Sequence, residues 1–359
     1  MKILKYLFFL ILIALIAGSI YIATKDGNYQ LEENTTINAP INLVYNEVNN
    51  FKNWENWGPW MDDTDDLILT YSDTASGEGA NYSWKSEKMG DGSITTKKAI
   101  PDSTIEQELT FVSKYGETKS DVYWKFDKAE EGTKVTWGIK GKQSFMEKLA
   151  FAFKDSSYTQ MMRPMLAEGM EKLNKVTIDK MDAYSISVDG ITQYGGGFYM
   201  YTTTASKISQ IQLKMPDMFT EVSRYMENNN ISIQGEPIII YNEWDEQNNN
   251  AIYSAGRFTP SLVITPAESP VLNGMMPVQK VVKTTLKGDY KNLKEAWDAA
   301  YKYIEENNLQ PALDSHPFEV YRTNPVITLN PAKWITEIYI PVTDKQEVII
   351  DNMMPETKN

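Results

Sequence analysis

The second half of the chain contains the same short pattern twice. Residues 225–231 read YMENNNI, and residues 303–309 read YIEENNL. A Pro-x-x-x-Tyr segment follows each copy, at residues 237–241 and 317–321. Two copies are fewer than the roughly three repeats that a solenoid needs to bury a continuous core. The duplication therefore predicts a pseudo-twofold domain with a cleft between its halves.

Each copy reads as strand, helix, strand and strand. Apolar residues recur at the i, i+3, i+4 and i+7 spacing of an amphipathic helix from residue 215 to 226 and again from residue 293 to 304. Strand-like segments follow each helix, at residues 238–241, 251–258, 318–321 and 334–342. With the antiparallel pattern of the first half described below, these elements predict an α+β protein.

Composition excludes several classes of function. The 359 residues carry a formal net charge of -13, whereas nucleic-acid binding needs a basic surface, so we expect no nucleic-acid partner. There is no cysteine and a single histidine, His316, which argues against thiol chemistry and against cysteine or multi-histidine metal sites. His316 precedes a proline in a turn-like segment, and we expect no catalytic role for it. We therefore expect no metal and no cofactor.

An uncharged, apolar run of 18 residues spans positions 6–23. Its length suits a transmembrane helix of about 17–25 residues, and Lys2 and Lys5 before it favour a cytoplasmic N-terminus. A cleavable signal peptide is the alternative, because residues 14–19 hold small side chains at plausible spacing. The apolar run continues past that point. We therefore expect an uncleaved, single-pass membrane anchor with the remaining chain extracytoplasmic, which means periplasmic in a Gram-negative cell.

The segment from residue 29 to 181 predicts one domain. A strand at 32–37 and a short helix through Val44 and Val48 come first, and alternating apolar residues between 67 and 140 then indicate an antiparallel meander. Helical spacing returns from 145 to 176. This order resembles the helix-grip fold of the START-like (SRPBCC) superfamily, in particular its polyketide cyclase/dehydrase-type members. The matching residues are 37–40 (INAP), 54–60 (WENWGPW), 77–80 (GEGA) with Trp84, and 135–137 (VTW).

The START-like resemblance implies an apolar cavity between the sheet and the long helix, and so a capacity to bind lipids or other hydrophobic small molecules. The candidate cavity residues are Trp57, Trp60, Trp84, Met162 and Met165. The alternative is that these side chains fill the core, since large aromatic residues and methionines commonly do so.

The segment from residue 183 to 345 resembles the GyrI-like small-molecule-binding domain, which also occurs as the effector-binding module of AraC- and MerR-type regulators. The residues that carry this resemblance are 288–290 (GDY), Pro317-x-x-x-Tyr321 and 336–342 (TEIYIPV). The resemblance implies a central pocket whose acid meets cationic, aromatic ligands, and it assigns that role to Glu337. Residues 346–359 are a C-terminal tail.

Glu337 also has a physical argument in its favour. It lies in a hydrophobic strand, and a carboxylate in a low-dielectric cleft costs free energy unless it is paired or protonated. A cationic ligand would pair with it, and aromatic walls would add cation–π attraction. Glu319, on the preceding strand, is expected to be a bystander. The predicted ligand-binding residues are Glu337, Tyr339, Trp334, Tyr321, Tyr241 and Trp297.

The sequence thus predicts a membrane-anchored, extracytoplasmic protein with two small-molecule-binding modules. The first would hold an apolar ligand and the second an amphipathic or cationic one. One alternative is a hydrolase that uses the pocket acid on reactive small molecules, as the GyrI-like resemblance also allows. A second alternative is a structural or partner-binding protein without a ligand. Binding is favoured over catalysis, because no spacing of residues demonstrates a second catalytic group near Glu337.

Overall fold

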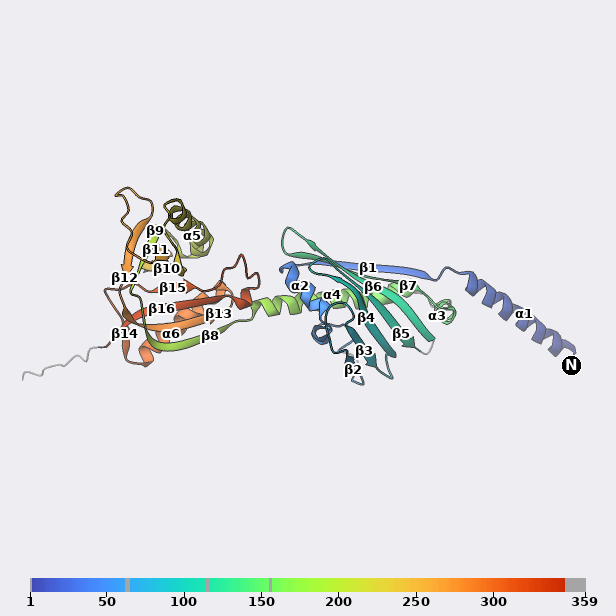
Figure 1. The fold of residues 1–359 in the computed structure, drawn as a ribbon. Helices are drawn as coiled ribbons and strands as arrows, with labels where there is room; N and C mark the ends of the chain where they lie inside the picture. The colour runs from blue at the N-terminus through green and yellow to red at the C-terminus, as the bar shows by residue number, and fades with distance from the viewer. Residues whose placement is uncertain (1, 62–64, 114–115, 155–156, 346–359) are drawn as a thin grey trace, which may run out of the picture. The chain divides into compact units, whose positions relative to one another are not determined.

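The computed structural model describes residues 2–61, 65–113, 116–154 and 157–345, so the predicted C-terminal tail lies outside the described residues. The chain divides into two compact units, Met1–Met181 and Asp182–Asn359. Both combine antiparallel sheets with helices, as the sequence predicts (Figure 1). Each unit has its own core.

The first unit is built on a seven-stranded antiparallel sheet with strand order β1-β7-β6-β5-β4-β3-β2. Alternation of buried and exposed side chains along these strands fits a sheet with one face against the core. The strands are β1 (Asn28–Ile37), β2 (Ile68–Tyr71), β3 (Asn81–Lys85), β4 (Asp91–Ile100), β5 (Thr104–Ser113), β6 (Gly116–Lys128) and β7 (Thr133–Lys142).

Two helices of the first unit, α2 (Ile41–Asn49) and α4 (Tyr158–Asp182), contribute buried side chains to the core on this sheet. Helix α1 (Lys2–Thr24) precedes β1, and α2 (Ile41–Asn49) with the 3-10 helix η1 (Phe51–Asn56) follows it. The sequence pattern from 145 to 176 forms two helices, α3 (Phe145–Phe151) and α4 (Tyr158–Asp182). Each has its own start signal. Ser144 caps α3 through a capping box, and the Ser157 hydroxyl accepts a hydrogen bond from the backbone N–H of Gln160 at 3.2 Å.

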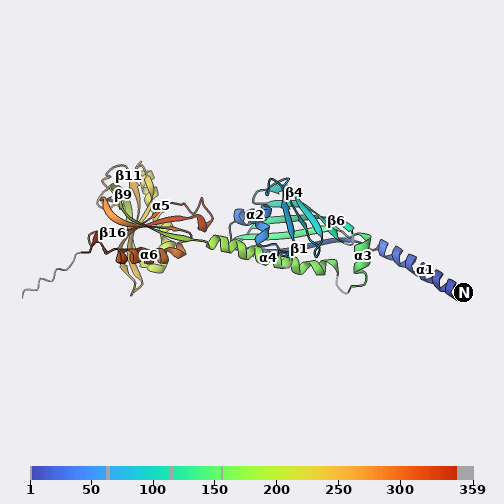
Figure 2. The same ribbon diagram turned by 90° about the horizontal axis from the view of Figure 1, so that it is seen from below.

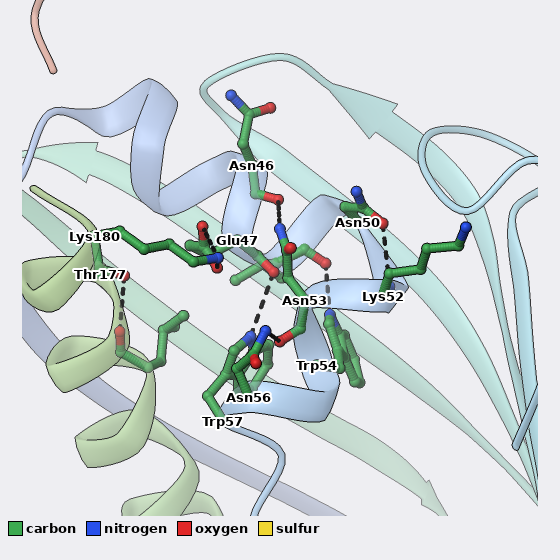
Figure 3. A network of polar contacts seen from close by, with 12 residues as sticks. Asn46, Glu47, Asn50, Lys52, Asn53, Trp54, Asn56, Trp57, Thr177 and Lys180 are labelled. Carbon is green, nitrogen blue, oxygen red and sulfur yellow. Dashed lines mark hydrogen bonds and ion pairs between the residues drawn. The ribbon is translucent and has the colours of Figure 1, made fainter. Parts of the chain in front are cut away.

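Tryptophans dominate the core of the first unit and are tied to α2. The indole nitrogen of Trp54 donates to the Val48 carbonyl at 2.7 Å, and that of Trp57 donates to the Glu47 carbonyl at 3.4 Å. The Glu47 side chain also points at Lys180 of α4, with a closest distance of 2.6 Å between Nζ and Oε2 (Figure 3). These bonds satisfy the indole nitrogens of Trp54 and Trp57 and the Glu47 carboxylate.

The second unit contains a nine-stranded antiparallel sheet with strand order β12-β9-β11-β10-β15-β16-β13-β8, and β14 pairs with β16. The strands are β8 (Ser185–Tyr194), β9 (Gly197–Lys207), β10 (Gln234–Asp245), β11 (Asn250–Thr259), β12 (Leu272–Met276), β13 (Gln279–Lys287), β14 (Leu309–Pro311), β15 (Phe318–Tyr321) and β16 (Ile335–Asp344). Short 3-10 helices occur at Ile208–Gln210, Tyr290–Asn292 and Pro331–Lys333.

Two amphipathic helices accompany this sheet (Figure 2). Helix α5 (Ile211–Asn228) packs on β9 and β11, and α6 (Leu293–Glu306) packs on β8, β13, β14 and β16. Met215 and Met218 of α5 share one apolar cluster with Ile239 of β10. Ala296 and Ala300 of α6 share another with Ile338 of β16. Strands β10 and β15, between these clusters, therefore lie at the centre of the sheet.

Candidate functional site

Glu319 is a fully buried carboxylate in the middle of the nine-stranded sheet. It lies on β15, where it is 0% exposed, and its cross-strand neighbours are Ile239 of β10 and Ile338 of β16. Direct neighbours in an antiparallel sheet present their side chains on the same face. Those two isoleucines belong to the clusters under α5 and α6, so Glu319 lies on the helix-covered face between the two clusters.

Three uncharged groups donate hydrogen bonds to Glu319. The Trp297 indole nitrogen lies 2.7 Å from Oε1, the Tyr321 hydroxyl donates to Oε2, and the Tyr241 hydroxyl is a third donor. Trp297 comes from α6, and the two tyrosines come from β15 and β10. Within the described parts of the chain, no lysine, arginine or histidine forms an ion pair with this carboxylate. Its negative charge therefore has hydrogen-bond donors but no counter-charge.

Burial shifts the pKa values in this cluster. Loss of solvent raises the pKa of Glu319 above its usual value, and the hydrogen bonds from Tyr321, Trp297 and Tyr241 only partly oppose that rise. Burial also raises the pKa of Tyr321 and of Tyr241 well above 10.0, and the nearby Glu319 charge adds to the rise. Both tyrosines therefore keep their protons and act as donors.

Aromatic rings enclose the carboxylate and its donors. Tyr321 contacts the ring of Tyr290 at a centroid distance of 5.3 Å and that of Phe219 at 5.9 Å, both edge-on. Tyr290 in turn packs against Trp334 at 4.8 Å. Arg257 lies over Phe219, 5.6 Å from its centroid, so one wall of the cluster already makes a cation–π contact. These rings are the kind of lining that recognises flat or cationic organic ligands.

A chain of aromatic contacts leads from Glu319 to the surface. Trp297 stacks on Tyr301 at 6.1 Å, and Tyr301 is 44% exposed. Tyr241 contacts Trp244 at 5.5 Å, and Trp244 is 52% exposed. Trp297 and Tyr241 also contact each other edge-on at 5.5 Å. The two donors thus stand between the buried acid and solvent-facing aromatic residues.

A buried hydroxyl beside the cluster has unused hydrogen-bonding capacity. Thr336 is the cross-strand neighbour of Tyr321, is 0% exposed, and its hydroxyl finds no hydrogen-bond partner among the residues that the structure describes. Such groups are usually satisfied in folded proteins, by protein or by ordered water. Thr336 is therefore a natural polar contact for a water or a ligand in this cluster.

The family comparison covers the segment that holds this cluster. Residues 197–343 match the GyrI-like small molecule binding domain. This segment contains Glu319 and all the aromatic residues that surround it. A comparison with curated proteins gives no match.

Solved structures with similarity include the C-terminal domain of EcmrR, with 16% sequence identity, 45% of this chain and 98% of that chain covered, and a TM-score of 0.38. An EcmrR–DNA complex gives 15% identity, 56% and 78% coverage, and a TM-score of 0.39. The protein SA2116 from Staphylococcus aureus gives 14% identity, 44% and 99% coverage, and a TM-score of 0.36. The GyrI-like assignment of this segment rests on the family match of residues 197–343. It does not rest on these solved structures.

Glu337 lies on the opposite face of the GyrI-like sheet. Its neighbour across β15 is Val320, and the adjacent Tyr339 stacks on Phe318 at 5.1 Å. Glu337 is buried, as its hydrophobic strand predicts, with 9% exposed. It is already paired by the chain itself, because Arg322 Nε lies 2.6 Å from Oε2 and Lys283 Nζ lies 2.9 Å from Oε1.

These partners change the physical argument for Glu337. Burial alone would raise its pKa, but hydrogen bonds from Lys283, Tyr339 and Arg322 lower the pKa below the usual value. Its charge is compensated without a ligand, so the free-energy argument for a cationic ligand does not apply there. That argument applies to Glu319, which the sequence analysis expected to be a bystander. The ligand-binding role of Glu337 and Tyr339 stays an untested prediction.

The other predicted residues of this domain come together around Glu319. Tyr321, Tyr241 and Trp297 are its hydrogen-bond donors, and Trp334 reaches the same cluster through Tyr290. The missed residue was Glu319 itself. Its signal was present in the sequence, because it takes the place that isoleucine holds in the first Pro-x-x-x-Tyr segment.

The candidate cavity residues of the first unit lie in or against its core. Trp57 is fully buried and contacts Trp124 and Trp137 edge-on, at 5.8 and 6.2 Å. Trp84 is 9% exposed, and its indole nitrogen has no hydrogen-bond partner among the described residues. The remaining three are partly buried against the same core: Trp60, Met162 and Met165. These positions fit the core-filling alternative, and ligand binding by this unit stays a prediction.

Proposed function

We propose that the GyrI-like segment binds an amphipathic, cationic small molecule, with Glu319 as its anchor. The observation that carries this proposal is a fully buried carboxylate with three neutral donors and no ionic partner in the described structure. A bound cation would supply the missing charge, and the electrostatic attraction would be strong because the site is shielded from water. Tyr290, Tyr321 and Trp297 would supply faces or edges for the ligand's rings.

Entry of such a ligand requires the aromatic side chains packed around Glu319 to move, because the carboxylate is fully buried. Trp297 is only partly buried, and it holds Glu319 through a single hydrogen bond. A hydrogen bond to a charged group contributes about 1.5–3 kcal/mol. A cation that displaces the indole must supply at least this much, and its direct pairing with a carboxylate shielded from water is the interaction that would do so. Tyr301 and Trp244 are the exposed residues at the outer end of the aromatic contacts that lead to Glu319.

A hydrolase is the second candidate function, and one observation favours it. A buried acid whose pKa is raised is a candidate proton donor, and Glu319 is such an acid. The neighbouring Tyr321 and Tyr241 hydroxyls are possible second polar groups for a reacting water. Turnover of electrophilic small molecules, lost in Glu319→Gln, separates this function from binding alone.

We further propose that the protein is anchored in a membrane through α1 with both units extracytoplasmic. Residues Ile3–Thr24 form a helix long and apolar enough to cross a bilayer, and 6% of its most apolar stretch is buried within the protein. Because the chain has no cysteine, a single Leu313→Cys at a 99% exposed site reports topology. An impermeant maleimide should label it in intact spheroplasts. Labelling only after lysis would overturn the proposed orientation.

For the first unit we propose a START-like fold that holds an apolar ligand. The support is the order of a strand, a short helix, a seven-stranded antiparallel sheet and a long C-terminal helix. The partly buried Met162, Met165 and Trp60 at the edge of the core are the side chains that would move to admit it. Regulation of transcription is not proposed, because the net charge of -13 opposes DNA binding.

Native mass spectrometry of the full-length protein, extracted gently from its own membrane, tests ligand binding directly. We expect added mass that is released as a cation and is missing from Glu319→Gln. Added mass that survives in Glu319→Gln but is released as a neutral lipid would indicate the first unit as the site. The proposal would be contradicted if wild type carries no added mass after extraction and also fails to bind cations that are then supplied.

A further inference from the structure

Large apolar side chains are exposed at one end of the first unit. Phe145 and Met146 at the start of α3 are 42% and 47% exposed, and Phe153 just beyond its end is 85% exposed. Together we call these three residues the α3 patch. Exposed single apolar residues are ordinary, but a group of large ones marks an interaction surface.

The α3 patch lies beside the C-terminal end of α1. Lys148 of α3 donates from Nζ to the carbonyl of Ala23 at 3.2 Å and to that of Lys25 at 2.6 Å. The backbone N–H of Gln143 donates to the Gly27 carbonyl at 2.8 Å, which holds the start of α3 against the same junction. Both ribbon views place α3 next to the α1–β1 connection (Figures 1 and 2). The α3 patch therefore belongs to a segment that is held beside the end of α1.

The surroundings of the α3 patch are basic, although the whole chain is acidic. Residues 25–28 and 142–154 carry four lysines, Lys25, Lys142, Lys148 and Lys154, against the two acids Asp26 and Glu147, whereas the whole chain has a net charge of -13. The Lys154 ammonium lies 4.7 Å from the centroid of Phe151. Basic residues around an apolar group are typical of segments that lie in the headgroup layer of a membrane, where lysine stems lie along the apolar zone and their charges meet anionic lipid.

We propose that α3 and residues 152–154 after it are embedded in the lipid interface beside the point where α1 leaves the bilayer. The occupant of the α3 patch is lipid, with anionic headgroups around the lysines. This inference rests on the proposed membrane insertion of α1. It adds a second membrane contact, which would hold the first unit at the bilayer surface and place its core next to a source of apolar ligands.

Single cysteines in this cysteine-free chain test the proposal. Phe153→Cys, Ile11→Cys and Ile68→Cys are labelled with the same environment-sensitive fluorophore in the full-length protein. Ile11 is a 50% exposed site within α1, and Ile68 is a 65% exposed site on β2, the strand at the opposite sheet edge from β1. The proteins are reconstituted into phosphatidylcholine/phosphatidylglycerol vesicles that contain lipids with a nitroxide quencher at shallow or deep positions.

We expect the Phe153 label to be quenched by shallow nitroxide at least about twofold more than the Ile68 label, as an interfacial segment would be. The Ile11 label should be quenched most by deep nitroxide. Adding Lys154→Glu to the Phe153→Cys protein should reduce quenching in vesicles with phosphatidylglycerol and change it little in pure phosphatidylcholine.

The outcomes separate this inference from the anchor. A quenched Ile11 label with an unquenched Phe153 label would overturn the α3 contact and leave the anchor intact. An unquenched Ile11 label would overturn both. If the Phe153 label is shielded but unquenched, and the shielding depends on protein concentration, a second copy covers the α3 patch and the lipid contact is wrong.

Discussion

Ile239 and Glu319 face each other as direct cross-strand partners on β10 and β15. They hold the same position in the two Pro-x-x-x-Tyr segments, so the pairing joins equivalent positions of the two copies. Only the second copy carries an acid at this position. It therefore lies where the copies meet, with Tyr241 and Tyr321, which end their segments, both donating to it.

Replacing Glu319 with Gln should leave the folded protein as stable as wild type or more stable at neutral pH without ligand. A buried charge without an ionic partner opposes folding, and an amide of the same shape avoids that cost. The raised pKa of Glu319 makes the wild-type free energy of unfolding fall as pH rises from about 4.5, its unfolded value, to the raised folded value. Glu319→Gln should flatten this dependence, which urea unfolding across pH 4–8 measures.

Glu337→Gln should have the opposite effect, because it leaves Lys283 and Arg322 without their shared partner. Breaking a buried pair costs about 3–5 kcal/mol, and the partial exposure of both cations reduces this to about 1–3 kcal/mol. The lowered pKa of Glu337 means that its stabilisation is present above about 4.5 and is lost as pH falls through the folded value. Urea unfolding of Glu337→Gln and wild type across pH 4–8 measures both the loss of stability and its dependence on pH. A stability unchanged from wild type at pH 7 would contradict the assignment of Glu337 as a structural ion-pair partner.

Lys180→Ala tests the polar network that joins α4 to α2. The Glu47 side chain, 11% exposed, would lose its ionic partner, and we expect a loss of about 1–3 kcal/mol in the free energy of unfolding. Lys98→Ala is the matched control, because the Lys98–Glu106 pair is 3.9 Å apart and over half exposed at both ends. Such a pair contributes at most about 1 kcal/mol. Equal losses in the two variants would mean that the α2–α4 ion pair is no more than a surface contact.

The order of elements could be predicted from periodicity alone. The two amphipathic helices after residue 208 and the strands that follow them lie close to the predicted segments, since each buries one face at a regular spacing. The break between α3 and α4 could not be predicted that way. Apolar spacing continues across it, and the local signal for a new helix is Ser157, whose hydroxyl accepts a hydrogen bond from the Gln160 backbone amide at the start of α4.

The candidate site was harder to predict than the fold. Alternation assigns a strand residue to a face, but it does not say which face the helices cover or which basic residues lie across the sheet. Glu337 and Glu319 both stand in hydrophobic strands. Only the pairing of β16 with β13 and β15 shows that one acid meets Lys283 and Arg322 while the other meets aromatic donors.

Calorimetric titration of the full-length protein with two ions of the same shape, tetraphenylphosphonium and tetraphenylborate, tests the central claim most directly. Wild type and Lys98→Ala should bind the cation and not the anion, and Glu319→Gln should lose about 2–5 kcal/mol of cation affinity, roughly 30-fold to several-thousand-fold in Kd. A folded Glu337→Gln protein should bind the cation as wild type does. Equal cation affinity in wild type and Glu319→Gln, or its loss in Glu337→Gln alone, would contradict Glu319 as the ligand anchor.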